Sequence, residues 1–184
     1  MKSSKIIAGV DEVGRGSLVG SVYSAAVIFD KNYIINNLAD SKKISELKRK
    51  NLANEIIMHS LSVSIGIATK DEIDSMNIHY ATLLSMRRAI INLNIIPNIV
   101  YVDGLYCPDI DIDCKAIIKG DTSIAEISAA SIIAKVARDN ELKYLNKLFG
   151  MYEFDKNKGY GTPKHLDTIS YLGKTIYHRE SFLK

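Results

Sequence analysis

The sequence of 184 residues has few cysteines, few prolines and no long apolar run, and each scarcity excludes a class of protein. No apolar run reaches about 18 residues, so no membrane span is predicted, and the first ten residues lack the apolar stretch of a signal peptide. Cys107 and Cys114 form no CxxC motif and have no histidine nearby, which predicts two free thiols in a reducing cytoplasm. With three prolines and no linker or repeat, we expect a single domain over residues 1–184.

The composition is that of a globular protein, with 47% hydrophobic and 24% charged residues. The net charge of +3 is unevenly distributed along the chain. Residues 1–114 carry 12 basic and 13 acidic side chains, whereas residues 115–184 carry 12 basic and 8 acidic ones. This basic C-terminal third favours an anionic partner, although basic surfaces are also common without one.

Apolar and β-branched segments alternate with helical patterns. We expect helices from a Ser45 N-cap through Met58, over Ile78–Leu93 and over Ser123–Phe149, the last opening with a capping box of Ser123 and Glu126. The expected strands are Lys5–Val10, Val19–Phe29, Leu61–Ala68, Ile99–Val102 and Ala116–Ile118. This order predicts an α/β fold with a mixed sheet.

Four acidic residues stand at or just after the ends of expected strands: Asp11, Glu12, Asp103 and Asp121. Carboxylates at the C-terminal ends of neighbouring strands converge on the crevice where such sheets bind ligands. Converging carboxylates repel one another unless a proton or a hard cation such as Mg²⁺ neutralises them. Each acid taken singly has a turn or cap role as its alternative. Adjacent strand residues point to opposite faces, so we expect the strand to break at Asp11 and Glu12.

Two loops combine glycine with basic residues. Gly14 and Gly16 allow close approach of a ligand to the backbone, and Arg15 between them suits a phosphate. Lys156–Thr162 places Tyr160 among lysines, a pattern typical of nucleic-acid binding, with a surface loop and a packing tyrosine as the alternative. A further basic pair, with a solvated turn as its alternative, is Lys42 and Lys43.

Together these motifs resemble the bacterial ribonuclease HII family over nearly the whole chain. The most specific feature is the DEVGRG run at residues 11–16, combined with two distant aspartates. The other matching segments are Asp40–Lys43 (DSKK), Val102–Gly104 (VDG), Lys119–Asp121 (KGD), Glu126–Asp139 (EISAASIIAKVARD), Lys158–Thr162 (KGYGT) and His178–Phe182 (HRESF).

The resemblance implies a ribonuclease H-like fold, with a five-stranded mixed sheet flanked by helices. It also implies a small helical C-terminal part, about residues 150–184, as a substrate-binding appendage. The implied activity is hydrolysis of the RNA strand of RNA–DNA hybrids and nicking of duplex DNA on the 5′ side of embedded ribonucleotides. The products would carry 3′-hydroxyl and 5′-phosphate ends. Two divalent ions, Mg²⁺ or Mn²⁺, would be held by Asp11, Glu12, Asp103 and Asp121.

The resemblance also implies particular substrate contacts. The backbone of Gly14, Arg15 and Gly16 would sense the 2′-hydroxyl group, and Tyr160 would pack on the sugar beside the scissile phosphate. The residues expected to hold flanking phosphates are Lys42, Lys43 and Arg179. We expect the protein to act as a monomer on RNA–DNA hybrids and ribonucleotide-containing duplexes, without a membrane; a sliding-clamp contact stays open. His165 and His178 are expected to be structural or solvent-exposed rather than general bases.

Some residues depart from the family pattern. Ser17 and Ser21 stand where the family commonly has proline, which predicts a less rigid loop. Asn157 replaces the usual histidine before Lys158, and Glu180 subtracts charge from a basic tail. None of these departures affects the four acids.

Two other functions are compatible with parts of the sequence. One is another ribonuclease H-like nuclease, such as a junction resolvase, against which the Gly14–Gly16 run and Tyr160 argue. The other is a non-catalytic nucleic-acid-binding module, against which the presence of all four acids argues. The related type HIII ribonuclease usually has an extra N-terminal domain, whereas ten residues precede Asp11 here.

Overall fold

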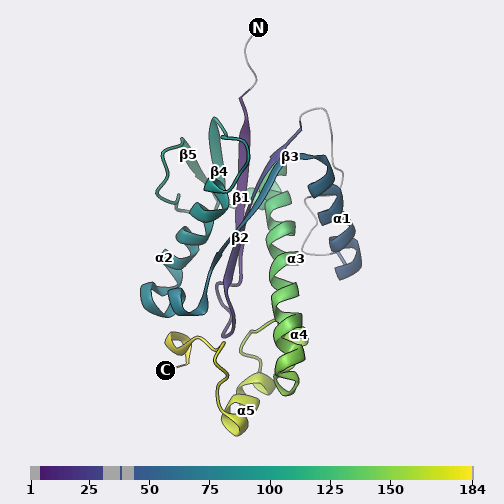
Figure 1. The fold of residues 1–184 in the computed structure, drawn as a ribbon, viewed down its shortest axis with the longest axis vertical. Coiled ribbons are helices and arrows are strands. Elements are labelled where there is room, and N and C mark those ends of the chain that lie inside the picture. Colours follow the sequence, from purple (N-terminus) through teal and green to yellow (C-terminus); the bar gives the residue numbers. More distant parts are fainter. Residues whose placement is uncertain (1–4, 31–37, 39–43, 184) are drawn as a thin grey trace.

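The computed structural model describes residues 5–30, 38 and 44–183, which form a mixed five-stranded sheet covered by helices (Figure 1). The strand order is β3–β2–β1–β4–β5. The β1–β2 and β2–β3 pairs are antiparallel, whereas the β1–β4 and β4–β5 pairs are parallel. The strands are β1 (Ile7–Val13), β2 (Val22–Phe29), β3 (Ser60–Ala68), β4 (Ile99–Asp103) and β5 (Cys114–Ile117). The expected α/β fold with a five-stranded mixed sheet is confirmed.

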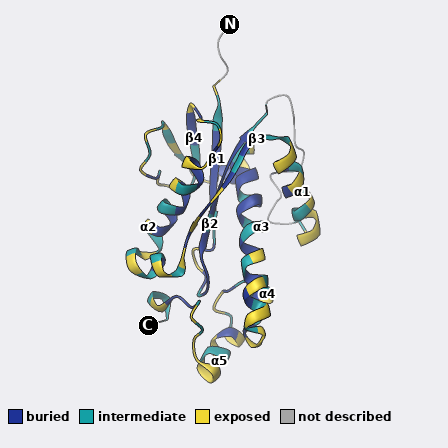
Figure 2. Ribbon diagram, viewed as in Figure 1, coloured by how far each residue is buried: buried dark blue, intermediate teal, exposed yellow. Residues whose placement is uncertain are grey.

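Helices cover both faces of the sheet. Helix α2 (Lys70–Ile91) packs on one face, and α3 (Ala125–Leu148) packs on the other with α1 (Glu46–His59) beside it (Figure 1). Alternate residues of β2 enter two separate cores: Ala25 packs with α3, and Ala26 packs with α2. Because both of its faces are covered, β2 is largely buried, as Figure 2 shows.

Strand β3 turns its small residues toward α2. A Cβ atom added to Gly66 would lie 2.0 Å from the Ser85 carbonyl oxygen, and the Ser64 hydroxyl donates to the Ala89 carbonyl. Ile65 and Ile67 are exposed on the opposite face. The alternation expected for this strand is present, and the small residues face the helix because the backbone of α2 approaches too closely for larger ones.

The starts of the first two long helices differ in how well the sequence predicts them. Ser45 caps α1 as expected, since its hydroxyl accepts from the Lys48 N–H group. Helix α2 consists of two helical segments, the first of which begins at Lys70 with a capping box of Thr69 and Glu72, while the second begins at the expected Ile78. It is kinked at Asn77, whose φ of 69° interrupts the helix.

The capping box expected for α3 is wrong. The helix begins at Ala125 after Ile124, whose side chain cannot cap. A Cβ atom added to Gly9 of β1 would lie 2.2 Å from the carbonyl carbon of Glu126, so the first turn lies directly against the strand. Tertiary packing therefore decides where this helix starts.

The C-terminal part packs on the far end of α3. It contains helices α4 (Phe154–Asn157) and α5 (Pro163–Leu172) and the short 3₁₀ turns η3 (Gly150–Tyr152) and η4 (Glu180–Phe182). Val19 packs there against Leu142, Tyr152 and Phe154 in a buried cluster. Among the helices of the described residues, none is both long and apolar enough to cross a bilayer. Cys107 and Cys114 are free, as expected.

Candidate active site

The first three acids lie where β1 separates from β4. The parallel β1–β4 pairing ends at Val10 and Val102, whereas β1 stays paired with β2 through Val13. The expected break in the strand at Asp11 and Glu12 is therefore wrong. The opening forms on the other side of β1, since its neighbour β4 ends at Asp103.

A cavity of about 380 Å³ occupies this opening. Asp11, Glu12 and Asp103 line one part of it, and Tyr160 from the C-terminal part also reaches it. The remaining lining residues come from β1, α1 and α3: Val13, Arg49, Ser131, Ile132 and Lys135. The structure thus brings three of the four predicted acids together with the predicted sugar-packing tyrosine.

The carboxylates in this cavity are electrostatically strained. Burial, followed by the charges of Glu12 and Asp103, raises the pKa of Asp11 well above its usual value. Burial also raises the pKa of Glu12, although Arg15, whose guanidinium lies 3.4 Å from it, opposes the shift. A bound divalent cation would relieve this repulsion and restore the ionised forms.

Divalent ions such as Mg²⁺ require oxygen ligands that converge on one position. In the part of the chain that the structure describes, no three His, Cys, Asp or Glu side chains are arranged to hold a metal together as they stand. Mg²⁺, however, is usually bound by one or two carboxylates together with water and substrate phosphates rather than by an all-protein cage. Three oxygen-donor side chains around one open cavity, of which Asp11 and Glu12 have raised pKa values, fit that mode of binding.

Asp121 lies beside this cavity rather than among its lining residues. It is buried in the 3₁₀ turn η2 (Gly120–Thr122), which follows β5. The turn is tied to the other acids, because the Gly120 N–H group donates to Asp103 Oδ1 at 2.7 Å. The Ser128 hydroxyl of α3 donates to the Asp121 carbonyl oxygen.

The glycine loop after β1 meets the tyrosine loop. Gly14 has a φ of 96°, and a Cβ atom there would lie 2.1 Å from Arg138 Nε, so glycine is required. A Cβ atom on Gly16 would lie 3.6 Å from the Tyr160 ring. The Leu18 N–H group donates to the Gly159 carbonyl at 2.8 Å. The expected 2′-hydroxyl and sugar contacts are therefore adjacent to each other.

Two fully buried arginines support this loop from below. Arg179 donates to the carbonyl oxygens of Arg15, Gly20 and Ser21 at 3.0, 2.9 and 3.2 Å. Arg138 donates to carbonyl oxygens on both loops, those of Val19, Ser21 and Lys158. The expectation that Arg179 contacts a phosphate is corrected: its guanidinium is buried and bonded to backbone. Arg138 lies within the matching segment Glu126–Asp139, but the sequence pattern did not indicate that its guanidinium would bind the carbonyl oxygens of the two loops.

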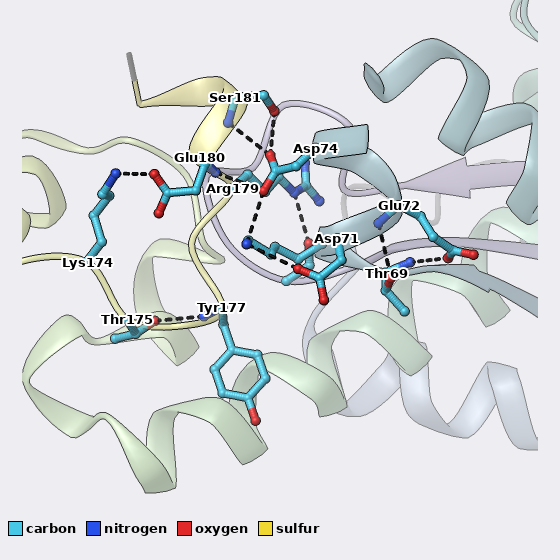
Figure 3. A network of polar contacts seen from close by, with 12 residues as sticks. Thr69, Asp71, Glu72, Asp74, Lys174, Thr175, Tyr177, Arg179, Glu180 and Ser181 are labelled. Carbon is cyan, nitrogen blue, oxygen red and sulfur yellow. Dashed lines mark hydrogen bonds and ion pairs between the residues drawn. The ribbon is translucent and has the colours of Figure 1, made fainter. Parts of the chain in front are cut away.

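The C-terminal tail that carries Arg179 is fixed to α2 (Figure 3). Asp74 accepts hydrogen bonds from the Glu180 and Ser181 N–H groups and from the Ser181 hydroxyl. Glu180 also forms an ion pair with Lys174. Glu180, which removes positive charge from the basic tail, thus helps to anchor the tail through its N–H group and pairs with Lys174 through its side chain.

His165 and His178 form a buried pair beneath the tyrosine loop. The Thr175 N–H group donates to His178 Nδ1 at 2.8 Å, so His178 carries its proton on Nε2. That proton points to His165 Nε2, and the two Nε2 atoms lie 3.2 Å apart. His165 Nδ1 donates to the Tyr160 carbonyl. Both rings are therefore satisfied as neutral imidazoles, which confirms that they are structural.

The family departures in the loops are also hydrogen-bonded. The Ser17 hydroxyl donates to the Val19 carbonyl at 2.9 Å, and the Ser21 hydroxyl donates to Glu141 at 2.7 Å. Asn157 donates to the Tyr152 carbonyl and accepts from the Gly159 N–H group. The bonds of Ser17 and Ser21 restrain the loop where prolines were expected, and those of Asn157 restrain the tyrosine loop. Lys42 and Lys43 lie outside the described residues.

Known proteins match this chain in sequence and in fold. The family model of ribonuclease HII matches residues 8–184. The crystal structure of ribonuclease H2 from Pyrococcus horikoshii OT3 is 26% identical, with a TM-score of 0.82 over 95% of this chain and 92% of that chain. The ribonuclease HII of Archaeoglobus fulgidus, solved in complex with PCNA, is also 26% identical, with a TM-score of 0.80 over 95% and 94%.

A more distant structure shares the fold. Bst-RNase HIII in complex with Mn²⁺ is 16% identical, with a TM-score of 0.68 over 94% of this chain and 71% of that chain. The match to the family model, by contrast, spans nearly the whole of the present sequence. This protein therefore belongs to the ribonuclease HII family and is a ribonuclease H.

Proposed function

We propose that this ribonuclease H is a metal-dependent endonuclease that hydrolyses the RNA strand of RNA–DNA hybrids and nicks duplex DNA 5′ of embedded ribonucleotides. The products would carry 3′-hydroxyl and 5′-phosphate ends. One observation carries the proposal: Asp11, Glu12 and Asp103 line the same cavity as Tyr160, beside the backbone of the glycine loop.

Asp11, Glu12 and Asp103, with Asp121 beside them, would hold two divalent ions, Mg²⁺ or Mn²⁺. When bound there, such ions would make a water molecule more acidic and would supply positive charge to the leaving oxygen. The chain itself positions the carboxylates through the β1–β2 pairing and through the Gly120 bond to Asp103. Ser131 of α3 also stabilises the ionised form of Asp11, which opposes the rise in its pKa.

The neighbouring loops would read the ribonucleotide. The backbone of Gly14, Arg15 and Gly16 would contact the 2′-hydroxyl group, and Tyr160, which is 45% exposed, would pack on the adjoining sugar. Both contacts need fixed loops, and the buried Arg138 and Arg179 supply that rigidity. The C-terminal part, about residues 150–184, would act as the substrate-binding appendage because it carries Tyr160, while Arg179 of the same part holds the glycine loop in place.

A nicking assay on matched duplexes containing zero, one and four ribonucleotides, with Mg²⁺, Mn²⁺ or a chelator, tests this function. We expect cleavage of both ribonucleotide duplexes with metal, none with chelator and none of the all-DNA duplex. End-group analysis should find 3′-hydroxyl and 5′-phosphate termini. Cleavage of all-DNA branched substrates would favour a junction resolvase instead. Salt-sensitive binding without any cleavage would favour a binding module.

A further inference from the structure

Helix α3 presents a polar row to the cavity in addition to its apolar face toward the sheet. Ser131, Lys135 and Asp139 follow one another at intervals of four residues and therefore share one side of the helix. Ser131 and Lys135 line the cavity that contains the carboxylates, and Asp139 lies one turn beyond them with 4% of its surface exposed.

Asp139 holds two cations that come from different helices. Its Oδ1 atom lies 2.5 Å from Lys135 Nζ, and its Oδ2 atom lies 3.9 Å from Arg49 Nη1 of α1. Both cationic side chains are largely buried, with 29% and 13% exposed, and both line the cavity. A second bond, from Arg49 Nη2 to the Ile44 carbonyl at 3.0 Å, further restricts the guanidinium.

The charges around the cavity are therefore segregated. Carboxylates occupy the strand side, and the cluster of Lys135, Arg49 and Asp139 on the helix side carries a net charge of +1. Burial lowers the pKa of Lys135, and Asp139 opposes this shift by stabilising the ammonium form. An ammonium group has three N–H donors, and among the described residues Asp139 accepts one of them. N–H donors of the Lys135 ammonium group therefore remain for an anion inside the cavity.

We propose that Lys135 and Arg49, held in place by Asp139, bind a phosphate of the cleaved strand next to the scissile one. The inference rests on the proposed function, which places a phosphodiester chain in this cavity. Metal ions neutralise the scissile phosphate, but the neighbouring phosphate would still face the carboxylates without a counter-charge. A fixed pair of protein cations across the cavity supplies that charge and sets the register of the strand.

Binding without cleavage provides the first test. In an Asp103→Asn background with chelator, affinity for a duplex with one ribonucleotide is measured between about 50 and 200 mM salt. We expect Lys135→Met to weaken binding roughly five- to tenfold and to reduce the salt slope by about one. Lys135→Arg should bind as the parent does. The matched control is Lys147→Met, an equal charge change at an exposed position of the same helix. Equal binding by the two methionine variants would overturn the proposal.

Cleavage kinetics separate this proposal from the function on which it rests. With Asp103 intact, Lys135→Met should raise KM more than it lowers kcat, and Lys135→Arg should restore KM. Thermal unfolding checks that each variant folds, and Lys135→Gln provides a polar replacement that keeps a donor. If the parent cleaves no ribonucleotide duplex but Lys135→Met still weakens binding, the proposed function fails and the phosphate site stands. If the parent cleaves and Lys135→Met matches it in KM, the phosphate site fails.

Discussion

Two regions of the molecule bury charge in opposite ways. One is the carboxylate wall of the cavity, formed by Asp11, Glu12 and Asp103, and the other is the arginine support beneath the loops, formed by Arg138 and Arg179. Asp11 is 5% exposed and lies among like charges that raise its pKa. Arg179 is fully buried as well, but its guanidinium meets three carbonyl oxygens. Burial and the nearby Arg138 lower the pKa of Arg179 to about 9, so it stays charged at neutral pH.

The difference between these regions lies in whether the protein itself satisfies the buried charge. Carbonyl oxygens that converge on a guanidinium make a structural element, complete without a ligand. Carboxylates that converge on a cavity form an incomplete arrangement, which a cation and a substrate can complete. Buried charge alone therefore does not identify an active site, whereas mutual repulsion around a cavity does.

The largest effect is expected from the carboxylate wall. Asp11→Asn should lower metal-dependent nicking by about a thousandfold or more, because a ligand and a charge are lost. The same change should leave the fold intact. In the presence of chelator, the free energy of unfolding should stay the same or rise, because the substitution removes repulsion from Glu12 and Asp103. Nicking rates and urea denaturation of the same preparation measure both effects. Full activity in this variant would exclude the carboxylate mechanism.

Substitution in the arginine support should lower the stability of the protein, in contrast to the loss of a carboxylate. Arg179→Met removes the side-chain donor to the Arg15 and Gly20 carbonyl oxygens and leaves the Ser21 carbonyl with Arg138 alone, which should cost on the order of 3 kcal/mol of stability. For a domain of this size that corresponds to a fall in Tm of roughly 6–12 °C, measured by calorimetry.

A matched control isolates the contribution of burial to this effect. Arg87→Met removes an equal charge at an exposed position and should change Tm by no more than about 2 °C. An equal loss in both variants would show that the carbonyl contacts of Arg179 contribute little.

The buried histidine pair gives a smaller, pH-dependent effect. Burial and the neighbouring His165 lower the pKa of His178 from 6.5 to about 4. Between these values the unfolded chain binds more protons than the folded one, so stability falls as the pH drops from 6.5 toward 4. The expected loss from pH 7 to pH 5 is about 2 kcal/mol. Denaturation of the parent and of His178→Gln across this range measures it, and an equally steep fall in the variant would contradict the assignment.

The sequence was sufficient to predict the sheet and the position of the acids, because both depend on local patterns. Apolar segments of strand length mark the five strands, and Asp103 ends β4 as expected. Gly14 also identifies its loop, since its positive φ and its close contact with Arg138 exclude larger residues.

Features that depend on tertiary contacts could not be predicted in the same way. The start of α3 depends on the approach of Glu126 to Gly9, two positions far apart in the sequence. Arg179 looks like a phosphate ligand in a basic tail, and its three carbonyl partners become apparent only when the tail returns to the glycine loop. Nothing in the spacing of Arg49 and Asp139 indicates that their helices meet.

The contact between Arg179 and Arg15 spans 164 positions of the chain. During synthesis at about 5–20 residues per second, roughly 8–30 seconds separate the appearance of the two residues. Throughout that interval the carbonyls of the glycine loop lack their final donor. The nascent protein can form its sheet before its glycine loop acquires its final shape. Maturation of the site is therefore a late event in biosynthesis, timed by the emergence of the tail.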